Sequence, residues 1–324
     1  MIRAVPRQTV EHSRSSDMDV KLARSSSNPI IEPRPQQVWE SRATFNPGAV
    51  MDGGVTHILY RAVNDRGISS LGYATTVDGE TILDRPTKPA LSPDGPWEEH
   101  GCEDPRITAF DRTYYVFYTA YSRRGPRIAL ASSRDFKTYE RHGIVGPDLD
   151  DKDCALFPQT IDGEVVVVHR VAPDIQLDFF QDLEQMRTSN PYWKDYGKRV
   201  EANTVMKPLY KWEEKKIGIG PPPIRTDHGW LVIYHGVDRH SVYRAGAALL
   251  DLEKPRRVIA RIPEPILEPE QEFERVGLVP NVVFPEGAVV IKGVLKVFYG
   301  AADRVCCVAS LPMKPMIETL KAYS

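Results

Sequence analysis

Short apolar runs separated by turns make up most of the chain from residue 28 onward, and hardly any stretch follows the period of an amphipathic helix. One arrangement recurs: a run of large apolar and aromatic residues is followed, after a loop, by a run rich in small residues. The strand pairs are expected at residues 57–62 and 71–75, 114–118 and 128–132, 230–236 and 245–250, and 295–300 and 305–310. A further copy starts at residues 165–170, and its second strand is obscured by the stretch 174–193.

The spacing of these pairs indicates an all-β fold of repeated units. The copies begin about 50 to 65 residues apart, a period that suits the four-stranded blades of a β-propeller. Five copies therefore predict a five-bladed β-propeller, and the 27 prolines and 22 glycines supply the turns that such a fold needs. A pair of β-sandwiches with chance similarity between their strands is the alternative.

Polar residues stand where the first strand of each unit ends. Because the strands of a propeller converge on a central pocket, Arg61, Arg170, His235 and Asp303 are expected to face one cavity. The repeat therefore predicts where a functional site would lie.

Three segments fall outside the repeat. Residues 1–27 are expected to form a flexible leader, and residues 28–324 a single propeller that carries the catalytic site. Residues 178–186 are expected to form a short helix or a lid-like insertion, and residues 316–321 a terminal helical turn or a strap over the last blade.

Composition and charge exclude several classes of partner. The 42 basic and 44 acidic residues give a formal net charge of −2, which does not indicate a binder of nucleic acid or of a membrane surface. No apolar run approaches the roughly 20 residues that span a bilayer, and the N-terminal residues lack the apolar core of a signal peptide. These features predict a soluble cytoplasmic protein.

The four cysteines agree with a reducing compartment. Cys102, Cys154, Cys306 and Cys307 form no C-x-x-C pair and have no histidine at metal-ligand spacing, so neither a disulfide framework nor a metal site is expected. Cys306 and Cys307 are neighbours in an apolar run, and on a strand they would point to opposite faces.

The stretch from Gly101 to Ile107 carries the first candidate for catalysis. Two adjacent carboxylates, Glu103 and Asp104, precede Pro105, which should bias Asp104 toward an extended conformation. Arg106 is expected to pair with one acid and orient it, leaving the other to act on a substrate. A fixed acid of this kind suits proton donation in glycoside chemistry, although a charged turn with a surface ion pair remains the alternative.

Ten short blocks, taken in order, resemble a known family. They are Phe45–Ala49, Tyr60–Ala62, Glu103–Arg106, Leu156–Pro158, His169–Arg170, Lys216–Pro223, Tyr234–Asp238, Leu249–Leu252, Pro280–Pro285 and Tyr299–Asp303. Between about residues 28 and 312 the sequence is similar to glycoside hydrolase family 130, the β-mannoside phosphorylases and related mannosidases, which are five-bladed β-propellers.

The resemblance implies a reaction with inversion at the anomeric carbon, which inorganic phosphate attacks to give α-mannose 1-phosphate and a shortened acceptor. Asp104 matches the proton donor of the family, whose proton reaches the glycosidic oxygen through a mannose hydroxyl. The implied phosphate-binding set is Arg170, Lys216, His235, Tyr243 and Lys152. Because family members that hydrolyse lack much of this basic set, its presence favours phosphate as the nucleophile.

For the sugar, the resemblance implies that Asn46, Arg61, Glu103 and Asp303 bind the mannose unit. Aromatic side chains at Tyr121, Tyr192 and Trp193 are candidate stacking platforms for the acceptor, with core packing as the alternative.

We therefore expect an enzyme that phosphorolyses a manno-oligosaccharide or a mannosylated small molecule, with phosphate as co-substrate and no metal or organic cofactor. The alternatives are a β-mannosidase that uses water, a β-mannosyltransferase and a non-catalytic glycan-binding propeller. The sequence leaves open the linkage (β-1,2 or β-1,4), the acceptor, the direction in the cell and the oligomeric state, a homo-oligomer included.

Overall fold

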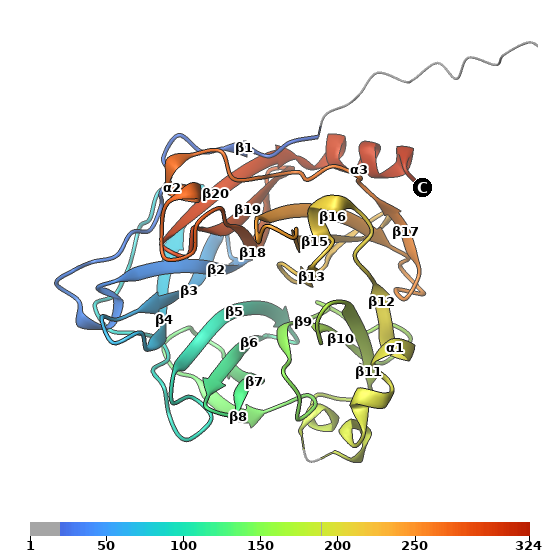
Figure 1. Ribbon diagram of the computed structural model, residues 1–324, viewed down its shortest axis with the longest axis horizontal. Helices are drawn as coiled ribbons and strands as arrows, with labels where there is room; N and C mark the ends of the chain where they lie inside the picture. The colour runs from blue at the N-terminus through green and yellow to red at the C-terminus, as the bar shows by residue number, and fades with distance from the viewer. Residues whose placement is uncertain (1–19, 189) are drawn as a thin grey trace, which may run out of the picture.

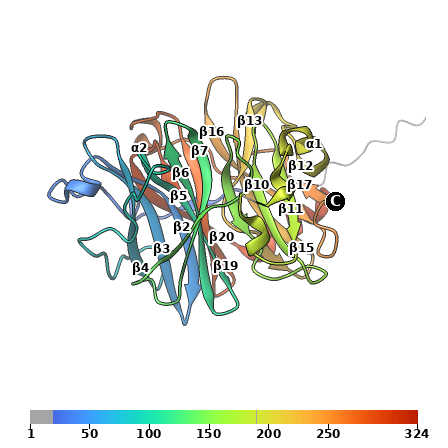
Figure 2. The same cartoon turned by 90° about the horizontal axis from the view of Figure 1, so that it is seen from below.

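The computed structural model describes residues 20–188 and 190–324, and these residues form a five-bladed β-propeller around a central axis (Figure 1). Seen from the side, the strands run between the two faces of the disc (Figure 2). The first two blades are β2 (Ala43–Asp52), β3 (Val55–Val63) and β4 (Ser69–Thr76), followed by β5 (Gly101–Phe110), β6 (Thr113–Ser122), β7 (Gly125–Ser133) and β8 (Glu140–Ile144). A single parallel bridge between Ser69 and Gly101 joins these two blades into one sheet.

The other three blades complete the ring. The third contains β9 (Lys152–Leu156), β10 (Val165–Arg170), β11 (Ile175–Phe180) and β12 (Thr204–Met206). The fourth contains β13 (Lys216–Ile219), β14 (Ile224–Thr226), β15 (Gly229–Val237), β16 (Tyr243–Leu250) and β17 (Val258–Arg261). The fifth contains β18 (Val283–Ile291), β19 (Val294–Ala301), β20 (Val305–Pro312) and β1 (Ala23–Arg24).

Helices are short and peripheral. The α-helices are α1 (Val200–Asn203), α2 (Glu272–Arg275) and α3 (Met313–Ala322), and the 3-10 helices are η1 (Val38–Glu40), η2 (Glu184–Met186), η3 (Pro191–Trp193), η4 (Tyr196–Lys198) and η5 (Lys211–Glu213). Helix α3 confirms the helical turn predicted at residues 316–321, and it packs Met316 and Leu320 into the core beside the fourth and fifth blades. No helix in the described part of the chain is long and apolar enough to cross a membrane.

The predicted alternation of large and small residues is confirmed and has a steric reason. The two runs are the second and third strands of a blade, and in the first and fourth blades a large ring from the second strand lies over a glycine of the third. A Cβ atom at Gly72 in β4 would lie 2.2 Å from the ring of Tyr60 in β3, and one at Gly246 in β16 would lie 2.5 Å from the ring of Tyr234 in β15. Small residues on the third strand therefore make room for the aromatic residues on the second.

The innermost strands of four blades each contain a β-bulge. The extra residue is Asn46 in β2 and Glu286 in β18, and the shifts in β5 and β9 fall at Asp104 and Asp153. Asn46, Asp104 and Asp153 have φ angles of 49°, 54° and 56°. The prediction that Pro105 would keep Asp104 extended is therefore wrong: the bulge places Asp104 in the left-handed region, which aspartate tolerates better than most residues.

Residues 1–19 of the predicted leader lie outside the described residues. The remainder of that segment, residues 20–27, contains β1, whose Ala23 and Arg24 pair with Ser310 and Ala309 of β20. The fifth blade thus takes its outermost strand from a segment that the sequence analysis assigned to the leader.

The prediction of a helix or lid at residues 178–186 is wrong over its first half. Asp178 to Phe180 belong to β11, the strand that pairs with β10 and was obscured in the sequence, and only Glu184–Met186 form a short helix. All four cysteines are free and buried. Cys306 and Cys307 pack into two different core clusters, which confirms that they point to opposite faces of their strand.

Candidate active site

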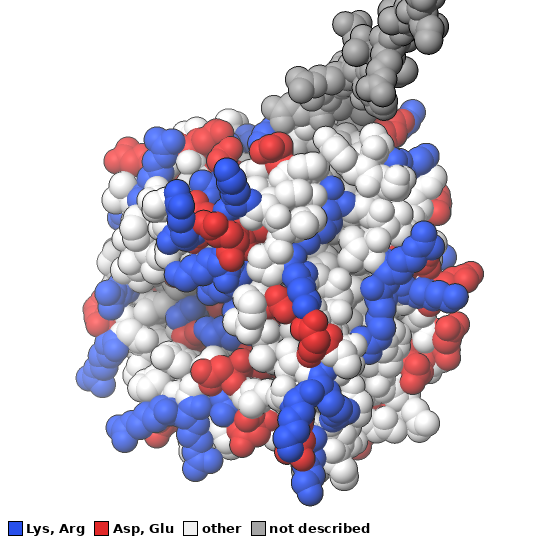
Figure 3. All heavy atoms as spheres, turned by 45° about the vertical axis from the view of Figure 1, so that its right-hand side comes forward, with Lys and Arg blue, Asp and Glu red and all other residues white. Residues whose placement is uncertain are grey.

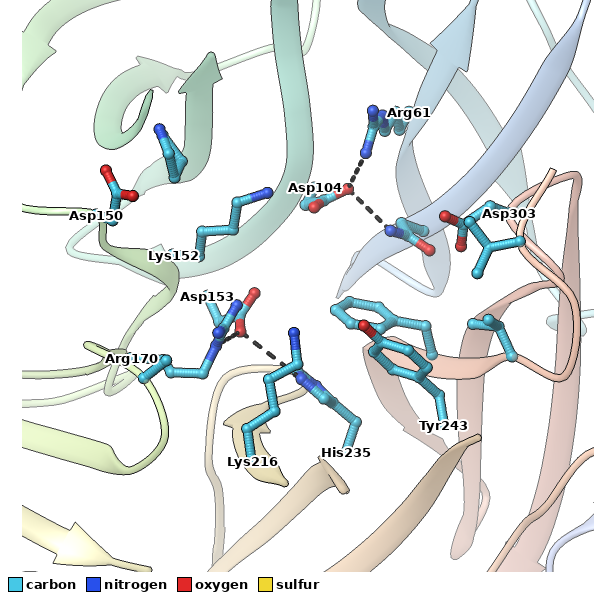
Figure 4. A pocket seen from close by; sticks show the side chains of 16 residues that line it. Arg61, Asp104, Asp150, Lys152, Asp153, Arg170, Lys216, His235, Tyr243 and Asp303 are labelled. Atoms are coloured by element: carbon cyan, nitrogen blue, oxygen red, sulfur yellow. Dashed lines mark hydrogen bonds and ion pairs between the residues drawn. The ribbon is translucent and has the colours of Figure 1, made fainter. Parts of the chain in front are cut away.

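A pocket of about 300 Å³ opens at the centre of the propeller (Figure 4). All the site residues proposed from the sequence line it, except Glu103, which lies directly behind Arg61. The lining residues are Asn46, Arg61, Asp104, Pro126, Asp150, Lys152, Asp153, Arg170, Ala172, Lys216, His235, Tyr243, Val279, Val282, Phe284 and Asp303. The prediction that Arg61, Arg170, His235 and Asp303 face one cavity is confirmed.

Asp104 is held on one side of the pocket by residues of the first blade. Its Oδ1 accepts hydrogen bonds from Nδ2 of Asn46 at 2.8 Å and from Arg61 at 3.3 Å. Burial acts to raise the pKa of Asp104, but Arg61 and Lys152 outweigh it and hold the pKa below its ordinary value. These neighbours therefore favour the carboxylate form of Asp104.

Arg61 organises the two adjacent acids. It donates a 2.6 Å hydrogen bond to Glu103 while also contacting Asp104, and it lies 4.8 Å over the ring of Phe45. Sequence analysis assigned this orienting role to Arg106, and that prediction is wrong. The bulge in β5 turns the side chain of Arg106 away, so that it donates to the backbone oxygens of Gly220 at 2.8 Å and Ile219 at 2.9 Å.

Asp303 lies on the same side of the pocket, in the turn between β19 and β20. Burial and the negative charges of Asp104 and Glu103 raise the pKa of Asp303 to about 6. Asp104 and Asp303 therefore differ in their affinity for a proton, although both carboxyl groups face the same cavity.

Arg170 and Lys216 lie across the pocket from Asp104 and Asp303, on the third and fourth blades, and Lys152 extends from the third blade toward Asp104 (Figure 4). Lys152 lies 3.7 Å from Glu103, and Arg170 donates a hydrogen bond through Nε to Asp153. Burial and the positive charge of Arg170 lower the pKa of Lys216 to about 8. The lowering follows from burial and from the crowding of cations on this side of the pocket, which outweigh the opposing charge of Asp153.

His235 is buried at the floor of this cationic side and carries no charge at neutral pH. Burial, together with Arg170 and Lys216, lowers the pKa of its imidazole to about 3, despite Asp153 at 3.8 Å. Neither ring nitrogen has a hydrogen-bond partner among the described residues. A neutral ring with an unused N–H suits hydrogen bonding to an oxyanion.

Asp153 is a site residue that sequence reasoning missed. It is 2% exposed and lies between Arg170, Arg106 and His235, so that one carboxylate holds groups from β5, β10 and β15. The signal in the sequence was present as the Asp-Lys-Asp run at residues 151–153, of which only Lys152 was singled out.

The three aromatic side chains predicted to stack on the acceptor sugar lie in two different environments. Tyr121 is 38% exposed, and the Lys152 ammonium, which lines the pocket, lies 5.8 Å from its ring. Trp193 is 5% exposed in the core of the third blade, and the half-buried Tyr192 packs against the same cluster, so that neither lines the pocket. Their prediction as stacking platforms is wrong, because the insertion after β11 folds inward onto β10 and β11.

The described residues contain no group of three or more histidine, cysteine or acidic side chains placed to hold a metal ion. Outside the pocket, acidic and basic side chains alternate over the surface shown in Figure 3.

Comparisons with known proteins agree with this geometry. Residues 17–322 match the sequence profile of glycoside hydrolase family 130, described as β-1,4-mannooligosaccharide phosphorylase. A 1,2-β-oligomannan phosphorylase from Thermoanaerobacter sp. (strain X514) is 42% identical over 91% of this chain and 98% of its own length. A β-1,2-mannobiose phosphorylase from the same organism is 43% identical over 87% and 94%.

A solved structure is similar over nearly its whole length. The β-1,2-mannobiose phosphorylase of Listeria innocua, in complex with β-1,2-mannobiose, superimposes with a TM-score of 0.81. It is 25% identical, and the match covers 93% of this chain and 99% of that one.

Proposed function

Because this chain belongs to glycoside hydrolase family 130, we propose that it catalyses the inverting phosphorolysis of a β-1,2-linked manno-oligosaccharide, with Asp104 as the general acid. The products are α-mannose 1-phosphate and an acceptor shortened by one mannose unit. The observation that carries this proposal is the division of the pocket, with Asp104 on one side, Arg170 and Lys216 on the other, and Lys152 reaching from the third blade toward Asp104.

A single protein acid is sufficient for this reaction. An inverting hydrolase needs a second carboxylate as a base to activate water, whereas phosphate is itself the nucleophile. A phosphate dianion needs several fixed donors. Arg170 is well suited, since Nε alone is occupied by Asp153 and its terminal nitrogens make no hydrogen bond within the described residues.

Bound phosphate also accounts for how Asp104 acquires the proton that a general acid must donate. Lys152 is one of the cations that hold the pKa of Asp104 down. A phosphate dianion beside Lys152 offsets that positive charge, which raises the proton affinity of Asp104 as the complex with both substrates forms. The acid can then donate through a mannose hydroxyl to the leaving oxygen, and the proton carried by hydrogen phosphate restores it.

The sugar-binding side is assigned to Asn46, Arg61 and Asp303, with Glu103 acting through Arg61. Their amide, guanidinium and carboxyl groups supply both donors and acceptors for vicinal hydroxyls. No metal or organic cofactor is required by this chemistry. The β-1,2 linkage is supported by the two relatives that are 42% and 43% identical, both of which carry that linkage in their names.

Product analysis with two disaccharides tests the proposal. The protein is incubated with β-1,2-mannobiose or β-1,4-mannobiose, with and without phosphate, and the anomeric products are followed by NMR. We expect α-mannose 1-phosphate from β-1,2-mannobiose only when phosphate is present, and much slower turnover of the β-1,4 isomer.

Each alternative has a different signature in this assay. Free mannose released without phosphate would show a β-mannosidase. Faster turnover of β-1,4-mannobiose would overturn the linkage. Binding of mannobiose without any product, unchanged in the Asp104→Asn variant, would show a glycan-binding propeller.

A further inference from the structure

A buried histidine lies between two carboxylates directly behind the cationic side of the pocket. Its ring nitrogens Nδ1 and Nε2 each lie 2.7 Å from a carboxylate oxygen, of Asp151 and Asp178 respectively. The side chains of His169, Asp151 and Asp178 are each at most 1% exposed. Tyr196, from the insertion after β11, donates a hydrogen bond to the same Asp178 oxygen and lies 3.1 Å from Nε2.

This geometry requires a charged ring. A carboxylate accepts hydrogen bonds, so both ring nitrogens can be satisfied only when both carry a proton. Burial opposes the charge, but Asp151 and Asp178 outweigh it and raise the pKa of His169 to about 10. At neutral pH the cluster is therefore an imidazolium held between the carboxyl groups of Asp151 and Asp178.

Asp151 and His169 are neighbours of pocket residues, both along the chain and across the sheet. Asp151 immediately precedes Lys152, and His169 immediately precedes Arg170. Lys152 and Arg170 are register partners across β9 and β10, and the bulge that turns Asp153 toward the pocket lies opposite His169. Since successive side chains of a strand point to opposite faces, His169 fixes the face behind Arg170.

We propose that His169 is a positioning residue for phosphate: clamped between Asp151 and Asp178, it holds the ends of β9 and β10 at the spacing that lets Lys152 and Arg170 reach one anion. The inference rests on the proposed phosphate site. The geometry that supports it is a two-sided clamp on adjacent strands whose next residues, Lys152 and Arg170, line the pocket.

The test measures phosphate and mannoside affinities separately. The His169→Gln variant cannot donate from both ends of its side chain, so one carboxylate loses its partner. We expect the KM for phosphate to rise about 10-fold, equivalent to about 1.4 kcal/mol, while the KM for β-1,2-mannobiose changes less than threefold. Isothermal titration with inorganic phosphate should show the same loss of affinity without turnover.

Two further variants keep the test decisive if His169→Gln folds poorly. Tyr196→Phe removes one donor to Asp178 at little steric cost and should raise the phosphate KM by a smaller factor, about threefold. Tyr118→Phe is the matched control: it removes a buried 2.7 Å hydrogen bond to Glu98 in the second blade, away from the pocket. It should lower the melting temperature without changing either KM.

The outcomes separate this inference from the proposed function. Lower stability in His169→Gln and Tyr196→Phe with phosphate affinity unchanged within twofold, or equal losses for phosphate and mannoside, would overturn the positioning role. If Arg170→Ala also left phosphate affinity unchanged, the phosphate site itself would be wrong, and the clamp proposal would fall with it. A phosphate-specific loss in Arg170→Ala but in neither clamp variant would overturn the clamp alone.

Discussion

Arg170 donates a hydrogen bond through Nε to Oδ2 of Asp153, a bond that presents the outer edge of the guanidinium to the pocket. The pair joins β10 to the bulge of β9, the innermost strand of its blade. A guanidinium fixed in this way offers two parallel N–H groups to an anion at little further cost in side-chain entropy.

Replacing this arginine should weaken phosphate binding selectively. Arg170→Ala removes a charge-assisted interaction worth about 1.5–3 kcal/mol, so the KM for phosphate should rise about 10- to 100-fold. The KM for mannoside should change much less, because the sugar contacts are assigned to the first and fifth blades. In the synthetic direction, affinity for mannose 1-phosphate should fall in parallel. Equal losses for phosphate and mannoside would mean that Arg170 is structural.

Asp104 is tested by an isosteric change. Asp104→Asn keeps an acceptor oxygen for Asn46 and Arg61, and Arg61 retains Glu103, so the fold should be preserved. An amide cannot donate the required proton, and kcat should fall about 10²- to 10⁴-fold. Steady-state kinetics on an unactivated mannoside and a thermal melt measure the two effects. A folded variant with near wild-type turnover would contradict the assignment.

The lowered pKa of Lys216 predicts that kcat/KM for phosphate declines at alkaline pH. Its pKa is lowered to about 8, so its charge is present below that pH and is lost as the pH rises through it. Phosphate is already mainly the dianion there, and kcat/KM for phosphate should therefore decline above about pH 8, the pKa of the free enzyme. The pH profile of kcat/KM for mannoside should lack this step.

Neighbouring lysines provide a matched comparison for this profile. Lys216→Ala should start from a lower kcat/KM for phosphate and lose the step. Lys215→Ala changes an exposed lysine bonded to Ser241 at 2.9 Å, and it should retain both the activity and the step. A step that persisted in Lys216→Ala would assign the titration to another group.

Asp153 should contribute to stability as well as to binding. Its carboxylate is buried between Arg106 and Arg170, and these charges outweigh burial and hold its pKa well below the ordinary value. Asp153→Asn leaves the guanidinium of Arg170 without its anion and that of Arg106 with only Glu286, 3.6 Å away, which should cost about 3 kcal/mol in the free energy of unfolding.

The pH dependence of that loss has a defined sign. A carboxyl group whose folded-state pKa is depressed stabilises the fold above its unfolded pKa, about 3.9 for aspartate, and loses this effect as the pH falls. The difference in unfolding free energy between wild type and Asp153→Asn should therefore shrink below about pH 4. Chemical denaturation at several pH values measures it, and a difference that stayed constant would contradict the ion-pair role.

The repeat and most of the pocket could be predicted from the sequence, and each prediction has its own physical reason. Aromatic residues over glycines, such as Tyr60 over Gly72, impose the alternation of large and small runs. Polar residues at strand ends converge because the blades share an axis, and this placed Arg170 and His235 correctly.

What escaped prediction depends on single-residue offsets and on distant partners. A bulge adds one residue to a strand and leaves no periodic trace, so the left-handed backbone of Asp104 was missed. Arg106 binds the backbone of Gly220, 114 residues away, which no local pattern reveals. In β11, the charged Asp178 interrupts an apolar run because its partners, His169 and Tyr196, are brought to it only by the fold.

The pairing of β1 with β20 has a consequence for the order in which the protein is made. Synthesis proceeds from the N-terminus, so Ala23 and Arg24 leave the ribosome almost three hundred residues before their partners, Ser310 and Ala309. A chain released before β20 would already contain every residue that lines the pocket, Asp303 included, but it would lack the strand that follows the turn of Asp303 and pairs with β1. On the ribosome, therefore, all the pocket residues are present before the fifth blade is complete, and that blade is completed only when β20 emerges to pair with both β19 and β1.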